Sequence, residues 1–325
     1  MNLPTPPTDR EGIRRCLLET GAVAVGFARA EPISTAAAAD YDSWIATGCH
    51  AGMDYLVRHA PLRLNPANVL EDVKTVISIA FNYNPPIRRS SKLPVIATYA
   101  YGDDYHDVLR RRLEPVVTLL RETLGGNWRI CIDTAPLPER YWAMRSGIGR
   151  RGLNGSVIID GYGSRIFLAE ILTTTEISPD TPSERRCIEC GACIRACPGK
   201  AIGQECHIDT RHCLSYLTIE HKGDFPPDID VLHTSAGQRT LYGCDICIEV
   251  CPHNHNVPTT TISEFTLRPA IATLTACQAS AMTQPQFSET FRGSAIKRAR
   301  LAGLQRNAAN CLPNTTMNTD TLNEI

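Results

Sequence analysis

The chain has 325 residues, and its 33 lysines and arginines nearly balance its 34 aspartates and glutamates. The formal net charge of −1 provides no overall basic field of the kind that marks a nucleic-acid-binding protein. No apolar run approaches the roughly 18 residues that a membrane-spanning helix needs. Charges interrupt the apolar stretches of residues 1–30, so these lack the apolar core of a signal peptide. Composition predicts a globular, cytoplasmic protein of one large domain or two, with no membrane partner.

The first half of the chain mixes predicted helices and strands. Residues 9–21 form a predicted helix, with Asp9 as its N-cap and Gly21 as its stop. The apolar runs at residues 22–28 and 75–83 indicate two buried strands, and an Asn-Pro-Pro sequence ends the second one.

A long amphipathic helix and further strands follow. Residues 102–126 place apolar side chains at helical spacing and end in two glycines, although Pro115 should kink this helix or start a new segment. Residues 128–136 predict a strand that runs into a loop. Residues 156–174 predict a hairpin that turns at residues 161–163. Together these elements indicate a mixed α/β or α+β domain.

Composition changes after residue 175, where a polar, proline-containing stretch suggests a boundary. We predict three parts: residues 1–178, residues 179–256, where cysteines dominate, and a helical C-terminal segment at residues 257–325. The last part contains a run with five basic residues and no acid: Arg292, Lys297, Arg298, Arg300 and Arg306. The polar residues 313–325 are predicted to be disordered.

The cysteines carry the strongest chemical signal. Nine of the 14 fall between Cys187 and Cys251, and a reducing cytosol opposes a disulfide framework, so metal or redox use is the better interpretation. The first run has the spacing C-x2-C-x2-C-x3-C-P of bacterial ferredoxins, and the second is the same run without its first member. The two runs comprise Cys187, Cys190, Cys193 and Cys197, followed by Cys244, Cys247 and Cys251.

Two [4Fe–4S] clusters need eight thiolates, and these runs supply seven. In two-cluster ferredoxins the last cysteine of each run binds the other cluster, which assigns Cys251 to the first cluster and Cys197 to the second. The eighth ligand is either Cys206 or Cys213, and spacing does not choose between them. A pair of structural zinc sites is the alternative, but zinc prefers two separated pairs of ligands, which the interleaved runs do not offer.

The N-terminal part offers one candidate acid and one weak motif. The glycines of residues 147–152 follow a helix-like segment and not a strand, which is the wrong context for a dinucleotide-binding loop. Asp133 leaves a predicted strand for a proline-rich loop. It is either a helix cap or a general acid whose pKa is raised by a dry pocket.

The order of these segments resembles the epoxyqueuosine reductase family. The residues that carry the resemblance include "DTAPLPERYWA", "CIECGACIRACPGKAI", "LYGCDICIEVCPHN" and, most specifically, "RHCLSYLTIE" between the two cysteine runs. Members of this family are cobalamin-dependent iron–sulfur oxidoreductases that reduce epoxyqueuosine to queuosine at the wobble position of tRNA anticodons. The resemblance implies an α+β fold in which a cobalamin-binding domain precedes a ferredoxin-like domain.

The resemblance also implies roles for individual residues. Cys213 would be the eighth cluster ligand, and Asp133 the proton donor beside base-off cobalamin, as in the related reductive dehalogenases. An unidentified low-potential donor would deliver electrons, which pass through both clusters, and the protein would be a monomer. Residues in segments that face the cofactor are Tyr99, Arg140, Asn154, Ser156, Ser215 and Asp245. A basic edge that could follow tRNA phosphates comprises Lys222, Arg239, Arg292, Lys297 and Arg298.

The sequence departs from the family pattern in two places. The sequence Gly-Arg-Arg-Gly-Leu-Asn at residues 149–154 replaces a G-W-I-G-K-N-like run, so the expected Trp and Lys are absent. The C-terminal helical repeats of longer members are absent too.

Two other functions are alternatives to tRNA reduction. One is a cobalamin-dependent reductase of a small molecule, and the other is an electron-transfer module without corrin.

Overall fold

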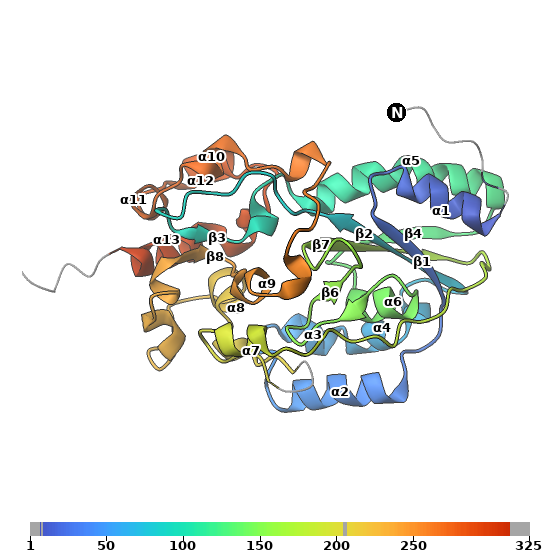
Figure 1. The fold of residues 1–325 in the computed structure, drawn as a ribbon, viewed down its shortest axis with the longest axis horizontal. Coiled ribbons are helices and arrows are strands. Elements are labelled where there is room, and N and C mark those ends of the chain that lie inside the picture. Colours follow the sequence, from blue (N-terminus) through green and yellow to red (C-terminus); the bar gives the residue numbers. More distant parts are fainter. Residues whose placement is uncertain (1–6, 8, 204–206, 313–325) are drawn as a thin grey trace, which may run out of the picture.

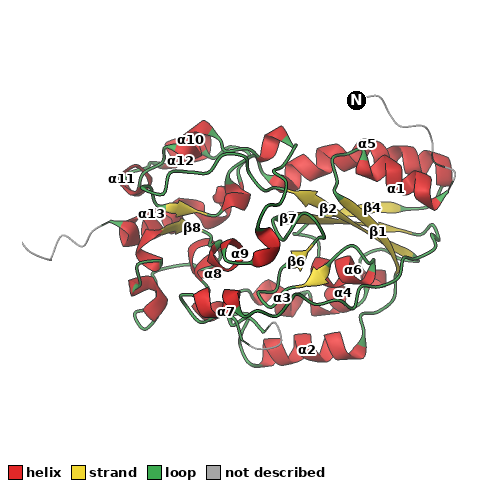
Figure 2. Cartoon of the chain, in the orientation of Figure 1, coloured by secondary structure: helices red, strands yellow, loops and turns green. Residues whose placement is uncertain are grey.

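The computed structural model describes residue 7, residues 9–203 and residues 207–312. Cys206 and the predicted disordered end at residues 313–325 therefore lie outside the described residues. Figures 1 and 2 show helices and strands mixed throughout the chain, as the sequence predicts for an α+β protein. Across the described part, no helix combines the length and the apolarity that a bilayer span requires.

A four-stranded sheet forms the centre of the N-terminal part (Figure 1). Its order is β1-β2-β7-β4, and each neighbouring pair is antiparallel. The strands are β1 (Ala24–Arg29), β2 (Thr75–Asn82), β7 (Ile166–Thr173) and β4 (Trp128–Cys131). The two central strands are buried on both faces, which explains why β2 is a continuous apolar run instead of an alternating one.

Helices cover both faces of this sheet. On one face lie α1 (Arg10–Leu18) and α5 (Tyr105–Leu124), and on the other lies α6 (Glu139–Arg145), with α2 (Thr35–Ala46), α3 (Asp54–Arg58) and α4 (Ala60–Leu64) farther out (Figure 1). The predicted cap of α1 is confirmed, because the Asp9 carboxylate accepts the Gly12 N–H at 2.7 Å. Helices α1, α5 and α6 bury apolar side chains against the sheet, which is the arrangement expected of layered α/β domains.

Of the two effects predicted for Pro115, the start of a new segment is wrong, and the kink stays a prediction. Helix α5 runs through this proline without a break. The ring is exposed, whereas Leu113, Val116 and Val117 on the same turn are buried against the sheet. The burial of this apolar face outweighs the cost of a proline in a helix interior, which is about 3 kcal/mol.

Replacing Pro115 with Ala should therefore stabilise the protein. The substitution restores an N–H that can donate to the Arg111 carbonyl and removes the clash of the ring, without touching the buried face. We expect the free energy of unfolding to rise by about 1–3 kcal/mol, measured by thermal unfolding with circular dichroism. Leu113→Ala is the contrasting variant and should destabilise the protein by about 2–5 kcal/mol. A lower melting temperature for Pro115→Ala would contradict this account of the helix.

The predicted hairpin at residues 156–174 is also wrong. Strand β6 (Val157–Ile158) pairs with β5 (Arg150–Arg151), whereas β7 pairs with β2 and β4. The chain does reverse at residues 161–163, but only a single bridge, from Ile159 to Gly163, crosses that turn. Long-range pairing won over the local turn because β7 is the apolar strand that fills the middle of the sheet.

The C-terminal part has a core of its own that takes in a segment from the first half of the chain. Strand β3 (Val95–Ile96) pairs in parallel with β8 (Thr240–Tyr242), and both contribute to a cluster with Phe287, Phe291 and Leu304. Around it lie α10 (Pro269–Ala272), α11 (Ala276–Ser280), α12 (Gln284–Thr290) and α13 (Arg300–Cys311). The short helices α7 (Ala192–Ala196), α8 (Leu214–Ile219, preceded by Cys213) and α9 (Ile246–Glu249) lie between this part and the sheet (Figure 1).

Candidate functional site

The cysteines of the two runs come together in two groups. The first group consists of Cys187, Cys190, Cys193 and Cys251. These cysteines line one small cavity together with residues 152–154 and Pro252. Burial raises the pKa of Cys251, and the neighbouring thiols of Cys190 and Cys187 add to the increase. Cys190 is exposed to solvent. The last cysteine of the second run therefore lies with the first three of the first run.

The second group brings Cys197 from the first run to the second run. Burial raises the pKa of Cys244 to about 12, with contributions from Cys213 and Cys197 nearby. The pKa of Cys247 is raised by the same causes, with Cys244 adding to them. Cys213 precedes α8 and lies close to Cys197. The group therefore consists of Cys197, Cys213, Cys244 and Cys247.

Asp133 follows the end of β4 and lies beside the first turn of α5. Its Oδ2 atom is 3.2 Å from Nε2 of His106, and the Nδ1 atom of His106 is 2.6 Å from Oδ1 of Asp104. The His106 ring stacks on Tyr105 at 4.1 Å between centroids, and Tyr105 stacks on Phe167 of β7 at 4.3 Å. The imidazole is thus held between two carboxylates by residues at the N-terminal end of α5.

The proton in this cluster belongs on His106. Burial alone would lower the pKa of His106, but Asp104 and Asp133 together raise it to about 9. Burial would raise the pKa of Asp133, yet hydrogen bonds from His106 and Tyr105 lower it below the ordinary value. The side chain of Asp133 is 55% exposed. The prediction of a dry pocket with a raised pKa for Asp133 is therefore wrong, because a cation lies beside this carboxylate.

The His106 contacts should make stability depend on pH in a defined range. A folded-state pKa of about 9 against an ordinary 6.5 means that the stabilisation is complete below pH 6.5 and is lost as the pH rises through 9. We therefore expect His106→Gln to lower the melting temperature most at about pH 6 and hardly at all at about pH 10. A difference between wild type and variant that is constant with pH would contradict the assignment.

Arg298 lies at the same cluster. It forms a bidentate ion pair with Glu220 of 2.7 and 2.8 Å, and its guanidinium lies 5.8 Å from the ring centre of Tyr55. Its charge also contributes to the low pKa of Asp133. Three distant parts of the chain, α3, α5 and the segment before α13, therefore meet around Asp133.

Comparisons with known proteins identify the family of this chain. The family model described as "Epoxyqueuosine reductase QueG, DUF1730" matches residues 63–134, and the "4Fe-4S double cluster binding domain" model matches residues 186–254. An epoxyqueuosine reductase of Cyclobacterium marinum is 36% identical over 82% of this chain and 85% of its own length. The chain belongs to the epoxyqueuosine reductase family. It is an oxidoreductase with a double [4Fe–4S] cluster-binding domain.

Solved structures of epoxyqueuosine reductases share this fold. One is a crystal structure with an epoxyqueuosine-modified tRNA-Tyr stem loop, with a TM-score of 0.84 and 28% identity over 93% of this chain and 80% of that chain. Another, from Bacillus subtilis, has its catalytic aspartate loop swung out of the active site, with a TM-score of 0.82 and 27% identity over the same shares.

Three residues that the resemblance places near cobalamin, Asn154, Ser156 and Ser215, lie at or beside the second cysteine group. The Asn154 amide donates to the Cys247 carbonyl at 3.3 Å, and its oxygen accepts the Ser156 N–H at 3.2 Å. Ser215 lies in the first turn of α8, and its N–H donates to the Cys213 sulfur. The turn between β5 and β6, which carries Asn154, therefore contacts the loop of the second cysteine run.

The other three residues of that set differ in their hydrogen-bond partners and in their exposure. Tyr99 hydrogen-bonds through its hydroxyl to that of Tyr242 at 3.1 Å. Asp245 is buried, and its carboxylate accepts both the N–H and the hydroxyl of Thr98, at 2.6 and 2.7 Å. Arg140 is exposed on α6. The Asp245 carboxylate thus fastens β3 and the segment after it to α9.

The residues of the predicted basic edge do not share one environment. Arg298 is exposed, pairs with Glu220 and lies near Asp133, as described above. Arg239 is exposed and donates to the Ser91 carbonyl, and Lys222, Arg292 and Lys297 are exposed as well. Contact of these residues with tRNA phosphates stays a prediction.

Three residues of the site escaped the sequence analysis: Tyr105, His106 and Glu139. His106 lies in the first turn of a predicted helix, two residues after Asp104, which caps the helix through the His106 N–H at 3.1 Å. Titratable residues of this kind at a helix start are common, so only their distance from Asp133 marks them. Glu139 accepts the Asp133 N–H at 2.6 Å.

Proposed function

We propose that this chain reduces the epoxide of epoxyqueuosine in tRNA to the alkene of queuosine. The observation that carries the proposal is the TM-score of 0.84 with an epoxyqueuosine reductase crystallised with an epoxyqueuosine-modified tRNA stem loop. Opening the ring and removing its oxygen as water takes two electrons and two protons. A chain that performs this reaction needs an electron relay and a proton source close together.

The two cysteine groups are the proposed relay. The first group, which includes the exposed Cys190, is the point at which an external low-potential donor would deliver electrons. The second group lies deeper, since its four cysteines are only partly exposed. Each group offers four thiolates. Cys251 of the second run lies with the first run, and Cys197 of the first run lies with the second, as in two-cluster ferredoxins. Electrons would then pass from the first cluster to the second.

The chain also offers polar partners that fit cobalamin. The Nε atom of Arg63 in α4 is buried and has no hydrogen-bond partner within the described residues. An unpaired buried donor costs about 1–3 kcal/mol, and the amide groups at the rim of a corrin are suitable acceptors. Arg63 lies near enough to Tyr55 and Glu139 to affect their pKa values. Cobalamin, when bound, supplies the two-electron chemistry at the epoxide.

The Asp133 cluster is the proposed source of protons. His106, with a pKa of about 9, is protonated at neutral pH and points its Nε2–H at the Asp133 carboxylate. Asp133, the more exposed of the two, can take the proton from His106 and pass it to the departing oxygen, and solvent water would supply the second proton. This pairing reconciles a proton donor with a carboxyl whose own pKa is low.

The proposal is tested by anaerobic reconstitution with iron, sulfide and cobalamin. The protein is then incubated with epoxyqueuosine-containing tRNA and a strong chemical reductant, and the nucleosides are analysed by mass spectrometry. We expect the modified nucleoside to lose the mass of one oxygen atom. Protein without cobalamin is the matched control.

Other outcomes would redirect the assignment. If cobalamin binds but the tRNA is unchanged, a small organic molecule becomes the better substrate. If no cobalamin binds, the chain is an electron-transfer module, and the proton cluster has no chemical task. Either outcome would overturn the proposed function.

A further inference from the structure

The backbone at Asp133 is held in an unfavourable conformation. Its φ angle is 44°, in the left-handed region, which costs a residue with a side chain about 1–2 kcal/mol. The preceding residue, Ile132, and the following Leu137 are buried. Between them, residues 133–136 form a short loop that carries the carboxylate to His106. A conformation of this kind persists only when its surroundings hold it in place.

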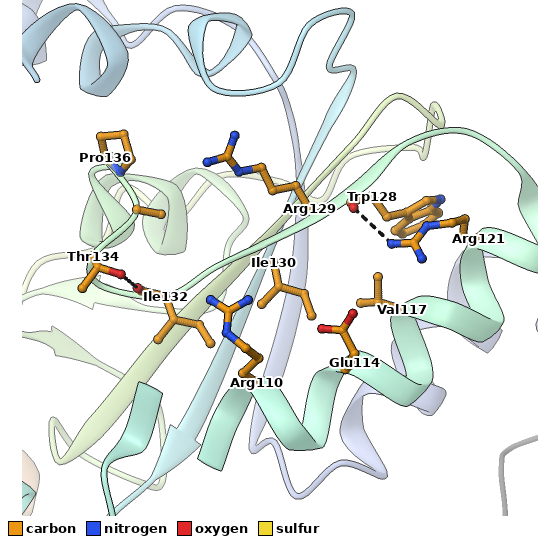
Figure 3. A pocket seen from close by; sticks show the side chains of 11 residues that line it. Arg110, Glu114, Val117, Arg121, Trp128, Arg129, Ile130, Ile132, Thr134 and Pro136 are labelled. Atoms are coloured by element: carbon orange, nitrogen blue, oxygen red, sulfur yellow. Dashed lines mark hydrogen bonds between the residues drawn. The ribbon is translucent and has the colours of Figure 1, made fainter. Parts of the chain in front are cut away.

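The packing on one side of this loop is incomplete. A cavity of about 380 Å³ lies between α5 and β4, and Thr134, Ala135 and Pro136 form one end of it. Figure 3 shows Thr134 and Pro136 beside this space, with Arg110 and Glu114 of α5 across it. The cavity separates residues 134–136 from α5, although the Asp133 side chain contacts that helix through His106. A contact on the other side of the loop would help to keep Asp133 turned toward His106.

Glu139 supplies that contact. It is the first residue of α6, and its Oε1 accepts the Asp133 N–H at 2.6 Å. Helix α6 is anchored firmly, because its Trp142 and Ala143 are buried against the sheet. A hydrogen bond from a backbone N–H to a carboxylate is stronger than one to a neutral acceptor. The contact thus ties the strained residue to a rigid element.

We propose that Glu139 is a positioning residue, whose carboxylate holds the Asp133 backbone in its left-handed turn and so keeps the Asp133 side chain on His106. The inference rests on the proposed function only in that Asp133 is taken as the proton donor. Glu139 touches neither the reacting atoms nor His106, and it acts on the reaction through the loop.

The charges around Glu139 are consistent with this role. Burial and then the Asp133 charge raise the pKa of Glu139 to about 7, while Arg140 and Arg63 oppose the increase. Glu170 of β7 faces it as well and is buried, with its own pKa raised. Protonation of Glu139 leaves an uncharged carbonyl oxygen within reach of the Asp133 N–H, so the contact weakens toward acid pH but is not lost.

Three substitutions separate this role from a general structural one. Glu139→Ala removes the acceptor, Glu139→Asp keeps the charge but shortens the side chain, and Glu139→Gln keeps a carbonyl oxygen in reach of the N–H. Glu114→Ala, across the cavity, is the matched control because Glu114 does not touch the loop. The holoenzyme is used throughout, and circular dichroism checks that each variant is folded.

Two measurements are made on each variant. The first is hydrogen exchange of the peptide covering residues 133–137, followed by mass spectrometry. The second is the kcat and KM for epoxyqueuosine-containing tRNA. We expect Glu139→Ala and Glu139→Asp to exchange faster in this peptide and to lose about 10–100-fold in kcat at unchanged KM. Glu139→Gln should recover most of both values, and Glu114→Ala should match the wild type.

The results that overturn the proposal are distinct. Unchanged exchange and kcat in Glu139→Ala would show that the loop does not need this contact. A lower kcat with unchanged exchange would show that Glu139 acts by another route. If Glu139→Ala does not fold, Glu139→Asp decides, and wild-type behaviour in that variant overturns the proposal. If the wild-type enzyme does not reduce tRNA, the proposed function fails, while the exchange measurement still tests the loop contact.

Discussion

Asp133→Asn should leave both clusters and cobalamin in place and lower kcat for tRNA reduction by about 10²–10⁴-fold, the usual contribution of a general acid. The amide keeps the size of the side chain but cannot carry a proton from His106 to the departing oxygen. It also removes one of the two carboxylates that raise the pKa of His106. Iron analysis and the visible spectrum report on the cofactors, and mass spectrometry of the nucleosides reports on turnover.

The matched control is Asp107→Asn. Asp107 lies one residue after His106 on α5, is exposed and belongs to the same helical turn. Its replacement changes the local charge by the same amount without touching the proton cluster, so activity should stay near the wild-type value. Full activity in Asp133→Asn would remove this residue from the mechanism and leave His106 as the proton donor.

Cys213→Ser should remove one cluster. Cys213 lies with Cys197, Cys244 and Cys247, so the variant retains the four thiolates of the first group and loses one ligand of the second. We expect the iron content after anaerobic reconstitution to fall to about half, because a [4Fe–4S] cluster normally needs four protein ligands. Reduction of tRNA should be lost, since electrons no longer pass beyond the first cluster.

Two further cysteine variants sharpen this result. Cys277→Ser changes an exposed cysteine on α11 and should retain all the iron. Cys206→Ser tests the alternative ligand that residue spacing left open, and it too should retain all the iron. If Cys206→Ser loses half the iron and Cys213→Ser loses none, the assignment of the eighth ligand is wrong.

Local elements followed closely from local patterns. The cap of α1, the apolar run of β2 and the amphipathic face of α5 each depend on neighbours a few residues away, and all three form where the sequence predicts them. The errors arose where distant segments compete. Pro115 did not break α5 because the sheet holds the helix on both sides of it, and β7 left the predicted hairpin to pair with β2 and β4.

Residue spacing was sufficient to predict iron–sulfur chemistry, whereas the role of Asp133 as an acid came from the family resemblance and stays a prediction. Closely spaced cysteines come from one tight loop, so a short stretch of sequence is enough to indicate the iron–sulfur site. Only the tertiary structure shows that His106, 27 residues before Asp133, holds the proton, and that Arg298 joins the same cluster. Burial and neighbouring charge determine a pKa, and both depend on which segments the fold brings together and not on their order along the chain.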